Sequence, residues 1–340
     1  MDANRIGVVG AGSWGTALAQ LLAERGFDVD LWVYEADLCE TINQNRENAV
    51  FLPGMRLSEK IRATNSLETA ARGKRTLVLA VPTHVMRQTV KSLAPCLQPG
   101  GLIVNASKGI ENDSLFTVHQ ILRETIGVSC SIAAISGPTF AAEIARHCPS
   151  ALVAAAEDLA TARAVQEIFS TPTLKVFASS DLLGVELGGA LKNVIAIATG
   201  ISDGLDLGYN ARAALITRGL VEMKRIGTAL GARPETFSGL SGMGDLVLTC
   251  TGDLSRNRTV GIRLGRGEKL SDIVSGMKMV AEGVLTVKSA CRLKEKLGIQ
   301  ASIIQETFRV LYEEKPARQA LTDLLKVEIS TEFAGVKGLE

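Results

Sequence analysis

Short apolar runs alternate with longer amphipathic stretches over the first half of the chain. The runs predict buried strands, and the stretches between them repeat apolar residues at helical spacing. Because each run ends in small or polar turn residues, the pattern predicts a doubly wound, mainly parallel sheet. The predicted strands are 5–9, 28–34, 76–81, 102–106 and 131–136, and the predicted helices between them include 16–22, 38–45, 67–72 and 84–93.

The pattern changes in the second half, where helical periodicity dominates from residue 181 onward. The segment 182–201 carries several glycines among apolar residues, which is typical of a tightly packed central helix. The stretch 150–177 contains the last strand-and-helix pattern and completes the sheet. We therefore predict a Rossmann-like dinucleotide-binding domain over residues 1–177 and an all-α domain over residues 178–340.

The first predicted strand ends in a glycine-rich turn, in which Gly10, Gly12 and Gly15 have G-x-G-x-x-G spacing. Gly10 allows the tight turn, Gly12 lets backbone amides approach a pyrophosphate, and Gly15 lets the following helix pack against the strand. The phosphates then lie at the positive end of the helix dipole. Since strand, turn and helix occur in the required order, we expect a dinucleotide site; a plain structural turn is the alternative.

The end of the second predicted strand bears on which dinucleotide binds. Glu35 follows Gly15 by twenty residues, where an acidic side chain holds the ribose 2′-hydroxyl of NAD. Either Tyr34 or Glu35 occupies the decisive position, and a solvated acid at a strand end is the alternative. Further on, the irregular Pro-Gly-containing stretch 46–54 is expected to lie over one edge of a cofactor cleft.

Composition excludes several classes of protein. Lys and Arg number 37 against 36 Asp and Glu, so overall charge gives no case for nucleic-acid or membrane binding. The six cysteines show no C-x-x-C spacing and are expected to be reduced thiols of a cytoplasmic protein. The three histidines lack metal-ligand spacing, so we expect no metal. We also expect neither a signal peptide nor a membrane-spanning segment.

Polar side chains in otherwise apolar or glycine-rich surroundings are the candidates for chemistry. Lys192 and Asn193 interrupt the apolar helix at 182–201, and a buried lysine charge is costly without a task; the alternative is a lysine that reaches the surface. Lys108 follows a predicted strand end, and Asp245 lies in a predicted glycine-rich turn.

A run of donor groups, Ser255-Arg256-Asn257-Arg258, has the composition that a small phosphate requires. Taken singly, each of these polar groups has a structural alternative as a loop lysine, a helix cap or a solvated arginine.

The chain resembles the NAD(P)-dependent glycerol-3-phosphate dehydrogenase family nearly from end to end. The resemblance implies a reversible reduction of dihydroxyacetone phosphate to sn-glycerol 3-phosphate by NAD(H) or NADP(H), and a homodimer. It is carried by GAGSWGTALA (10–19), NAVFLPG (48–54), AVPTHVMR (80–87), SKGIE (107–111), SGPTFAAE (136–143), ELGGALKNVIAIATGISDGL (186–205), GMGDLVLTC (242–250), SRNRTVG (255–261) and AEGV (281–284).

The resemblance also implies roles for particular residues. Lys192 is the general acid and base, Asp245 orients it and keeps it charged, and Lys108 adds positive charge. The substrate-binding positions are Lys108, Gly137, Thr139, Lys192, Asn193, Asp245, Ser255, Arg256 and Asn257, with Arg256 and Asn257 holding the phosphate. The cofactor-binding positions are Gly10, Gly12, Ser13, Trp14, Gly15, Tyr34, Glu35, Lys108, Ala141, Arg256, Val280 and Glu282.

The stretch Trp32-Val33-Tyr34-Glu35 departs from relatives that carry a basic residue after the second strand. Because Glu35 repels a 2′-phosphate, we expect NADH to be used at least as well as NADPH. Two other functions remain alternatives. One is another β-hydroxyacid or sugar-phosphate dehydrogenase of similar two-domain build, and the other is a redox-sensing protein that binds the nucleotide without turnover.

Overall fold

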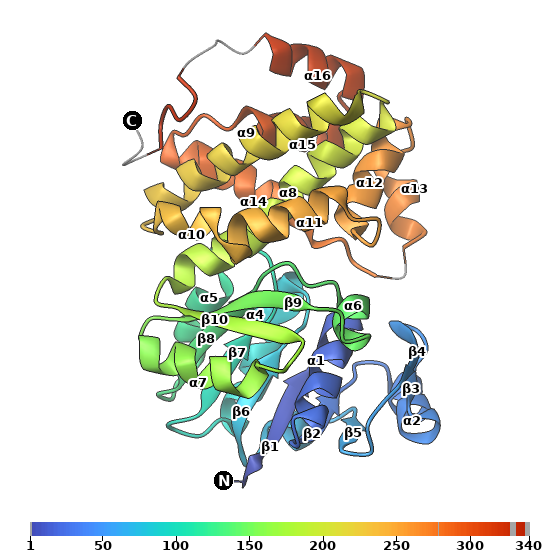
Figure 1. Cartoon of the computed structure of the whole chain (residues 1–340), viewed down its shortest axis with the longest axis vertical. Coiled ribbons are helices and arrows are strands. Elements are labelled where there is room, and N and C mark those ends of the chain that lie inside the picture. Colours follow the sequence, from blue (N-terminus) through green and yellow to red (C-terminus); the bar gives the residue numbers. More distant parts are fainter. Residues whose placement is uncertain (1, 278, 327–330, 337–340) are drawn as a thin grey trace. The chain divides into compact units, whose positions relative to one another are not determined.

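The computed structural model describes residues 2–277, 279–326 and 331–336 (Figure 1). The chain divides into two compact units, one of Met1–Ser107 with Val118–Leu182 and one of Lys108–Thr117 with Leu183–Glu340. These units differ from the predicted division after residue 177 in two places. The first unit extends to Leu182, and the segment Lys108–Thr117 packs with the second unit although the sheet surrounds it in sequence.

The first unit is built on an eight-stranded sheet with the order β10-β9-β8-β7-β6-β1-β2-β5. All neighbouring strands are parallel except β8 and β9, so the predicted mainly parallel sheet is confirmed. The strand order reverses at β1, which lies between β6 and β2, and ligands of such sheets bind outside the strand ends at this point. The strands are β1 (Asp2–Val9), β2 (Asp28–Trp32), β5 (Ile61–Thr64), β6 (Lys74–Leu79), β7 (Leu102–Asn105), β8 (Ser131–Ser136), β9 (Ser150–Ala156) and β10 (Leu174–Ser179).

Helices connect these strands, and their ends follow from local chemistry. The Ser66 side chain accepts a hydrogen bond from the Thr69 N–H and so caps α3, and Asp158 caps α7 in the same way. The core of the unit consists mainly of aliphatic residues from the sheet and from α1. The helical elements are α1 (Ser13–Glu24), α2 (Ala36–Asn45), α3 (Leu67–Ala71), α4 (Thr83–Leu93), η1 (Ala94–Cys96), α5 (Val118–Thr125), α6 (Ala141–Ala145) and α7 (Leu159–Phe169).

The stretch predicted to be irregular at residues 46–54 is in fact largely ordered, which corrects the sequence-based expectation. It contains β3 (Glu47–Asn48) and the start of β4 (Leu52–Arg56), which pair as an antiparallel hairpin. The pattern missed these strands because Pro53 and Gly54 lie inside β4, and both residues are normally depleted in strands.

The described part of the second unit is helical. Its central helix, α8 (Leu182–Gly204), is apolar and long enough to cross a membrane, but 89% of the relevant window is buried within the protein, as in a core helix of a soluble fold. The aliphatic core gathers around α8. The other elements are α9 (Gly208–Ala229), α10 (Pro234–Ser238), the π-helical turn η2 (Leu240–Gly244), α11 (Asp245–Thr251), α12 (Arg256–Gly265), α13 (Leu270–Ser275), α14 (Glu282–Leu297), α15 (Ser302–Tyr312) and α16 (Ala317–Leu325).

Candidate functional site

The glycine-rich turn of the first unit joins β1 to α1, as the sequence predicts. Gly10 has a φ of +113°, and a Cβ there would lie 2.8 Å from the Ala80 carbonyl oxygen. A Cβ on Gly15 would lie only 1.8 Å from the Gly10 carbonyl oxygen. Both glycines are therefore required by the fold itself, one by its backbone conformation and the other by the close approach of helix and turn.

Gly12 differs, because a Cβ there would meet nothing within 4 Å. The fold leaves open space beside this residue, which is the N-cap of α1. Nearby in sequence, the buried Trp14 indole Nε1 has no hydrogen-bond partner in the described part of the protein. An open approach to a helix N-terminus, together with an unsatisfied donor, fits the pyrophosphate of a dinucleotide.

The β3–β4 hairpin is hydrogen-bonded to this turn. The Asn48 amide donates to the Ala11 carbonyl at 2.8 Å, and the Ser13 hydroxyl donates to the Phe51 carbonyl at 2.6 Å. The Asn48 side chain is fully buried. The hairpin thus holds the glycine-rich turn in place.

The end of β2 presents the two residues expected to choose between NAD and NADP. Tyr34 is 75% exposed, and Glu35 is the exposed N-cap of α2. The amide of Asn65 donates to the carbonyls of Val33 and Tyr34 and so fixes the backbone there. Both candidate side chains are accessible to a ligand.

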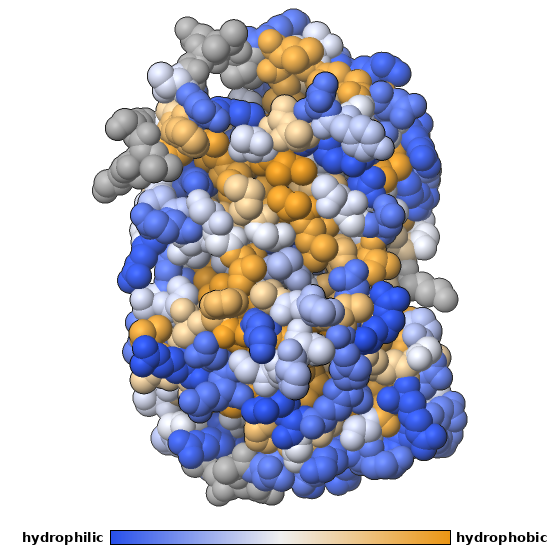
Figure 2. All heavy atoms as spheres, viewed as in Figure 1, coloured by the Kyte–Doolittle hydropathy of each residue, from blue (hydrophilic) through white to orange (hydrophobic). Residues whose placement is uncertain are grey.

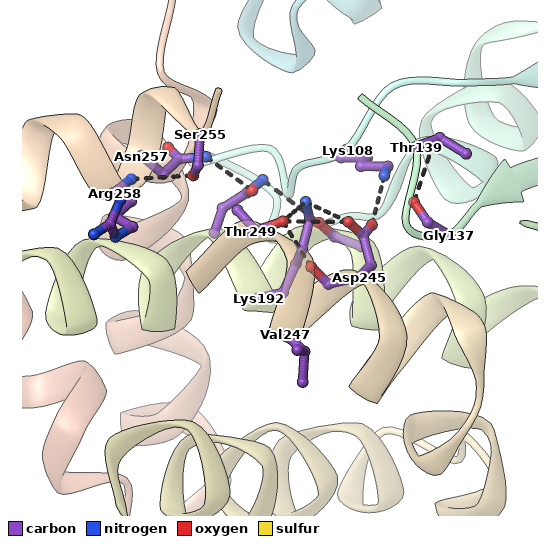
Figure 3. A network of polar contacts seen from close by, with 12 residues as sticks. Lys108, Gly137, Thr139, Lys192, Asp245, Val247, Thr249, Ser255, Asn257 and Arg258 are labelled. Carbon is purple, nitrogen blue, oxygen red and sulfur yellow. Dashed lines mark hydrogen bonds and ion pairs between the residues drawn. The ribbon is translucent and has the colours of Figure 1, made fainter. Parts of the chain in front are cut away.

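The turn after β8 carries the remaining candidates of the first unit. A Cβ on Gly137 would lie 2.7 Å from the Leu152 Cα, so the turn passes close to β9. The Thr139 hydroxyl donates to the Gly137 carbonyl at 3.1 Å, as drawn in Figure 3. Ala141 begins α6.

In the second unit, two lysines flank one buried carboxylate (Figure 3). The Lys192 Nζ lies 2.7 Å from Asp245 Oδ1, and the Lys108 Nζ lies 2.5 Å from Asp245 Oδ2. The Asp245 side chain is 2% exposed, that of Lys192 8% and that of Lys108 18%. Three candidates that are far apart in the sequence are therefore brought together, and Lys108 reaches this cluster because the segment 108–117 belongs to the second unit.

The same segment is anchored in the helical core. Ile110 is 3% exposed among the core residues, and its carbonyl accepts a hydrogen bond from the Ser289 hydroxyl of α14. The Arg292 guanidinium donates to the Asn112 carbonyl. These contacts fix the position of Lys108 within the second unit.

Burial and charge act in opposite directions in this cluster. Burial lowers the pKa of Lys192 to about 8, against the opposing effect of the Asp245 charge, and Lys108 lowers it further. Burial raises the pKa of Asp245, but the charges of Lys108 and Lys192 outweigh it, so the pKa lies below its usual value. The carboxylate is therefore ionised, and Lys192 exchanges its proton near neutral pH. Asp245 acts in the expected direction, because its charge raises the pKa of Lys192.

Thr249 completes the surroundings of Lys192 and was missed by the sequence analysis. The Lys192 ammonium donates to the Thr249 hydroxyl at 2.6 Å, and this hydroxyl donates to the Asp245 carbonyl at 2.6 Å. Asp245 begins helix α11 directly after η2 rather than lying in an irregular turn, so Thr249 stands one helical turn later on the same face. Assigning a helix there would have revealed the spacing.

The predicted phosphate-binding residues form the first turn of α12. Ser255 is its N-cap, with the hydroxyl accepting from the Arg258 N–H at 3.2 Å. Arg256 is exposed, and Glu282 is close enough to interact with its charge. Glu282 begins α14, and the exposed Val280 precedes it. An arginine at a helix N-terminus is a suitable site for a phosphate.

Two side chains of this turn bind protein groups. The Asn257 amide donates to Asn193 Oδ1 at 2.9 Å, and its oxygen accepts from the Gly283 N–H at 2.9 Å. Arg258 pairs with Asp203 and Asp253. The guanidinium of Arg258 is thus engaged with carboxylates.

No group of three or more potential metal-ligating side chains occurs within residues 2–277, 279–326 and 331–336. The six cysteines are all free thiols. The cluster of Lys192, Asp245, Lys108 and Thr249 can instead transfer a proton and stabilise a developing negative charge on an oxygen atom.

Comparison with known proteins agrees with this chemistry. Residues 5–162 match the family described as NAD-dependent glycerol-3-phosphate dehydrogenase N-terminus, and residues 181–322 match its C-terminus. The glycerol-3-phosphate dehydrogenase [NAD(P)+] of Geobacter sulfurreducens is 56% identical over 330 residues, which cover 96% of this chain and 98% of the relative.

Solved structures of similar proteins extend the match. The glycerol-3-phosphate dehydrogenase of Coxiella burnetii has a TM-score of 0.92 and 36% identity, covering 95% of this chain and 99% of its own. The glycerol-3-phosphate dehydrogenase of Saccharomyces cerevisiae has a TM-score of 0.80 and 25% identity, covering 94% of this chain and 99% of its own.

Proposed function

The chain belongs to the NAD-dependent glycerol-3-phosphate dehydrogenase family, and from this we propose how its residues reduce dihydroxyacetone phosphate reversibly to sn-glycerol 3-phosphate. The observation that carries the proposal is the buried Lys192, held between Asp245 and Thr249. A bound nicotinamide, NADH or NADPH, supplies the hydride. This reaction provides the glycerol backbone of phospholipids.

Lys192 is the general acid of the reduction and the general base of the reverse reaction. Its Nζ gives a proton to the ketone oxygen while negative charge develops there, and it takes the hydroxyl proton back in oxidation. A pKa of about 8 suits both directions, because neither protonation state is strongly disfavoured near neutral pH.

Asp245 and Lys108 set the charge around this group. The Asp245 carboxylate accepts from both lysines and directs the Lys192 ammonium, which also donates to Thr249. Lys108 adds a second cation that stabilises negative charge on the substrate. Thr139 and Gly137 are proposed to contact the substrate as well.

Arg256 holds the substrate phosphate together with the first turn of α12, where Ser255 is the N-cap. Asn257 belongs to this turn and donates a hydrogen bond to Asn193 of α8. A phosphate-binding turn favours dihydroxyacetone phosphate over substrates that carry a carboxylate instead, since arginine and a helix N-terminus recognise a dianion strongly.

The dinucleotide is proposed to bind at the glycine-rich turn, with Gly12 against the pyrophosphate and Glu35 or Tyr34 at the adenosine ribose. Open space at Gly12 and the unsatisfied Trp14 Nε1 support this proposal. NADH is expected to serve at least as well as NADPH. The other proposed cofactor contacts are Gly10, Ser13, Gly15, Lys108, Ala141, Arg256, Val280 and Glu282.

The test is the absorbance of reduced nicotinamide in the presence of dihydroxyacetone phosphate, with each cofactor in turn. We expect substrate-dependent oxidation of NADH, and a kcat/KM for NADPH that is no greater. Absence of oxidation with either cofactor would refute the proposed function. Preference for NADPH by more than about tenfold would refute only the role of Glu35.

The assembly is proposed to be a homodimer located in the cytoplasm. Free thiols support a reducing compartment. The second unit has a groove of about 620 Å³, whose lining includes aliphatic residues of α9, α15 and α16. Because an exposed apolar groove is typical of a protein–protein contact, it supports the proposal that a second copy of the chain binds there. Figure 2 shows apolar residues gathered over these helices between the polar ones.

A further inference from the structure

Helices α8 and α12 pack against each other at backbone distance. A Cβ on Gly261 would lie 2.1 Å from the Ile197 carbonyl oxygen, and one on Gly200 would lie 2.2 Å from the Arg258 carbonyl oxygen. The next turn repeats this contact with Gly204 and Gly265, whose Cβ positions would meet Ile262 and Ile201 carbonyls. Only glycines allow the two helices to approach so closely.

The contacts show that the helices run parallel. The pairs Gly200–Gly261 and Gly204–Gly265, in which a Cβ on either glycine would lie within 3.0 Å of the Cα of the other, advance both helices by one turn. The buried hydrogen bond between Asn193 and Asn257 is a further contact of α8 with the first turn of α12. This register places Arg256 level with Ile195, less than one turn beyond Lys192, so the proposed phosphate-binding turn lies close to the proposed general acid.

One ion pair fastens the first turn of α12 to α8. The Arg258 Nε lies 2.8 Å from Asp203 Oδ2, and the other Asp203 oxygen lies 2.7 Å from Arg212 of α9. The Asp203 side chain is 9% exposed and that of Arg258 13%. Asp203 lies three turns along α8 from Lys192, too far to touch a three-carbon substrate bound there.

We infer that Arg258 is a positioning residue, which holds the phosphate-binding turn at a fixed place relative to Lys192 and so contributes to the preference for phosphorylated ketones. Arg258 follows Arg256 by two residues, yet its guanidinium is directed to Asp203 and Asp253. The inference rests on the proposed function of Arg256 and Lys192.

The experiment compares two arginines that share one carboxylate. Arg258→Ala and Arg212→Ala each remove one partner of Asp203, but only Arg258 lies on the phosphate-binding turn. Wild type and both variants are assayed with dihydroxyacetone phosphate and with unphosphorylated dihydroxyacetone. The affinity for sn-glycerol 3-phosphate is measured by calorimetry.

Arg258→Ala is expected to lower kcat/KM for the phosphorylated ketone by about tenfold to a hundredfold, mainly through KM, because misplacement of a binding group by about 1 Å has effects of this size. The kcat/KM for dihydroxyacetone should stay unchanged. Arg212→Ala should leave the ratio of the two substrates at its wild-type value.

Three results would overturn the inference: equal losses on both ketones, an equal change of the ratio in Arg212→Ala, or no change in Arg258→Ala. A wild type that does not oxidise NADH with dihydroxyacetone phosphate would instead refute the proposed function. If Arg258→Ala does not fold, Asp203→Asn breaks the same pair from α8 and must show the same selective loss, with Arg258→Lys restoring part of the affinity.

Discussion

At the scale of single residues, the protonation of Lys192 governs the proposed chemistry. Burial brings the pKa to about 8, while Asp245 acts in the opposite direction. Reduction needs the protonated amine, so kcat/KM for dihydroxyacetone phosphate should fall as pH rises through about 8. Oxidation of sn-glycerol 3-phosphate needs the free amine, so its kcat/KM should rise over the same interval.

The Asp245→Asn variant is a control for this pH profile. Because the Asp245 charge raises the pKa of Lys192, its removal should shift the pH dependence of the remaining reductase activity to lower pH. A pH dependence that does not shift would show that another group titrates.

Thr249 is expected to act by orienting Lys192. Thr249→Val keeps the shape of the side chain but removes the hydroxyl that accepts from the ammonium, so kcat should fall by about tenfold or more while the NADH affinity stays constant. Steady-state kinetics and fluorescence titration measure the two quantities. Thr251→Val is the matched control, since this exposed hydroxyl on the same helix donates to the Val247 carbonyl and not to a residue of the proposed site. Equal kcat values in both variants would exclude the role.

The sequence was sufficient to single out Lys192 and Asp245, because each is a charged residue in apolar or glycine-rich surroundings. Thr249 was not predicted as a site residue, because an uncharged threonine does not stand out from an apolar stretch as a charged residue does. Its importance depends on the helix that starts at Asp245, whose first residue follows a π-helical turn.

At the scale of elements, the glycine-rich turn separates residues needed by the fold from one needed by the ligand. Gly12→Ala should leave the melting temperature unchanged, because its Cβ meets nothing, but should weaken NADH binding. Gly15→Ala places a Cβ against the Gly10 carbonyl and should destabilise the protein by more than about 3 kcal/mol. Differential scanning calorimetry and NADH titration distinguish the two. Full NADH affinity in Gly12→Ala would contradict a pyrophosphate at this turn.

Elements with a strong apolar period were predictable, and weakly patterned ones were not. Strand β8 was predicted at its observed bounds, since six apolar or small residues are flanked by turn residues. The hairpin at Glu47–Arg56 was not, because its order comes from contacts such as Asn48 with Ala11 that lie far away in the sequence.

At the scale of the whole molecule, the sequence indicated two units but not the exchange of Lys108–Thr117 between them. This exchange depends on Ile110 packing into the helical core, and no local sequence pattern predicts this packing.

The proposed homodimer predicts a mass twice that of the chain in sedimentation equilibrium. A single-chain mass at concentrations used for kinetics would exclude a dimer as the active form.

The central claim is that Lys192 transfers the proton in a reaction of dihydroxyacetone phosphate. The most direct measurement is the kcat of Lys192→Ala for NADH oxidation, together with the affinity of this variant for NADH. We predict that kcat falls by at least about a thousandfold, as for removal of a general acid, with NADH affinity intact. A variant that folds, binds NADH and retains about a tenth of the wild-type kcat would contradict the account.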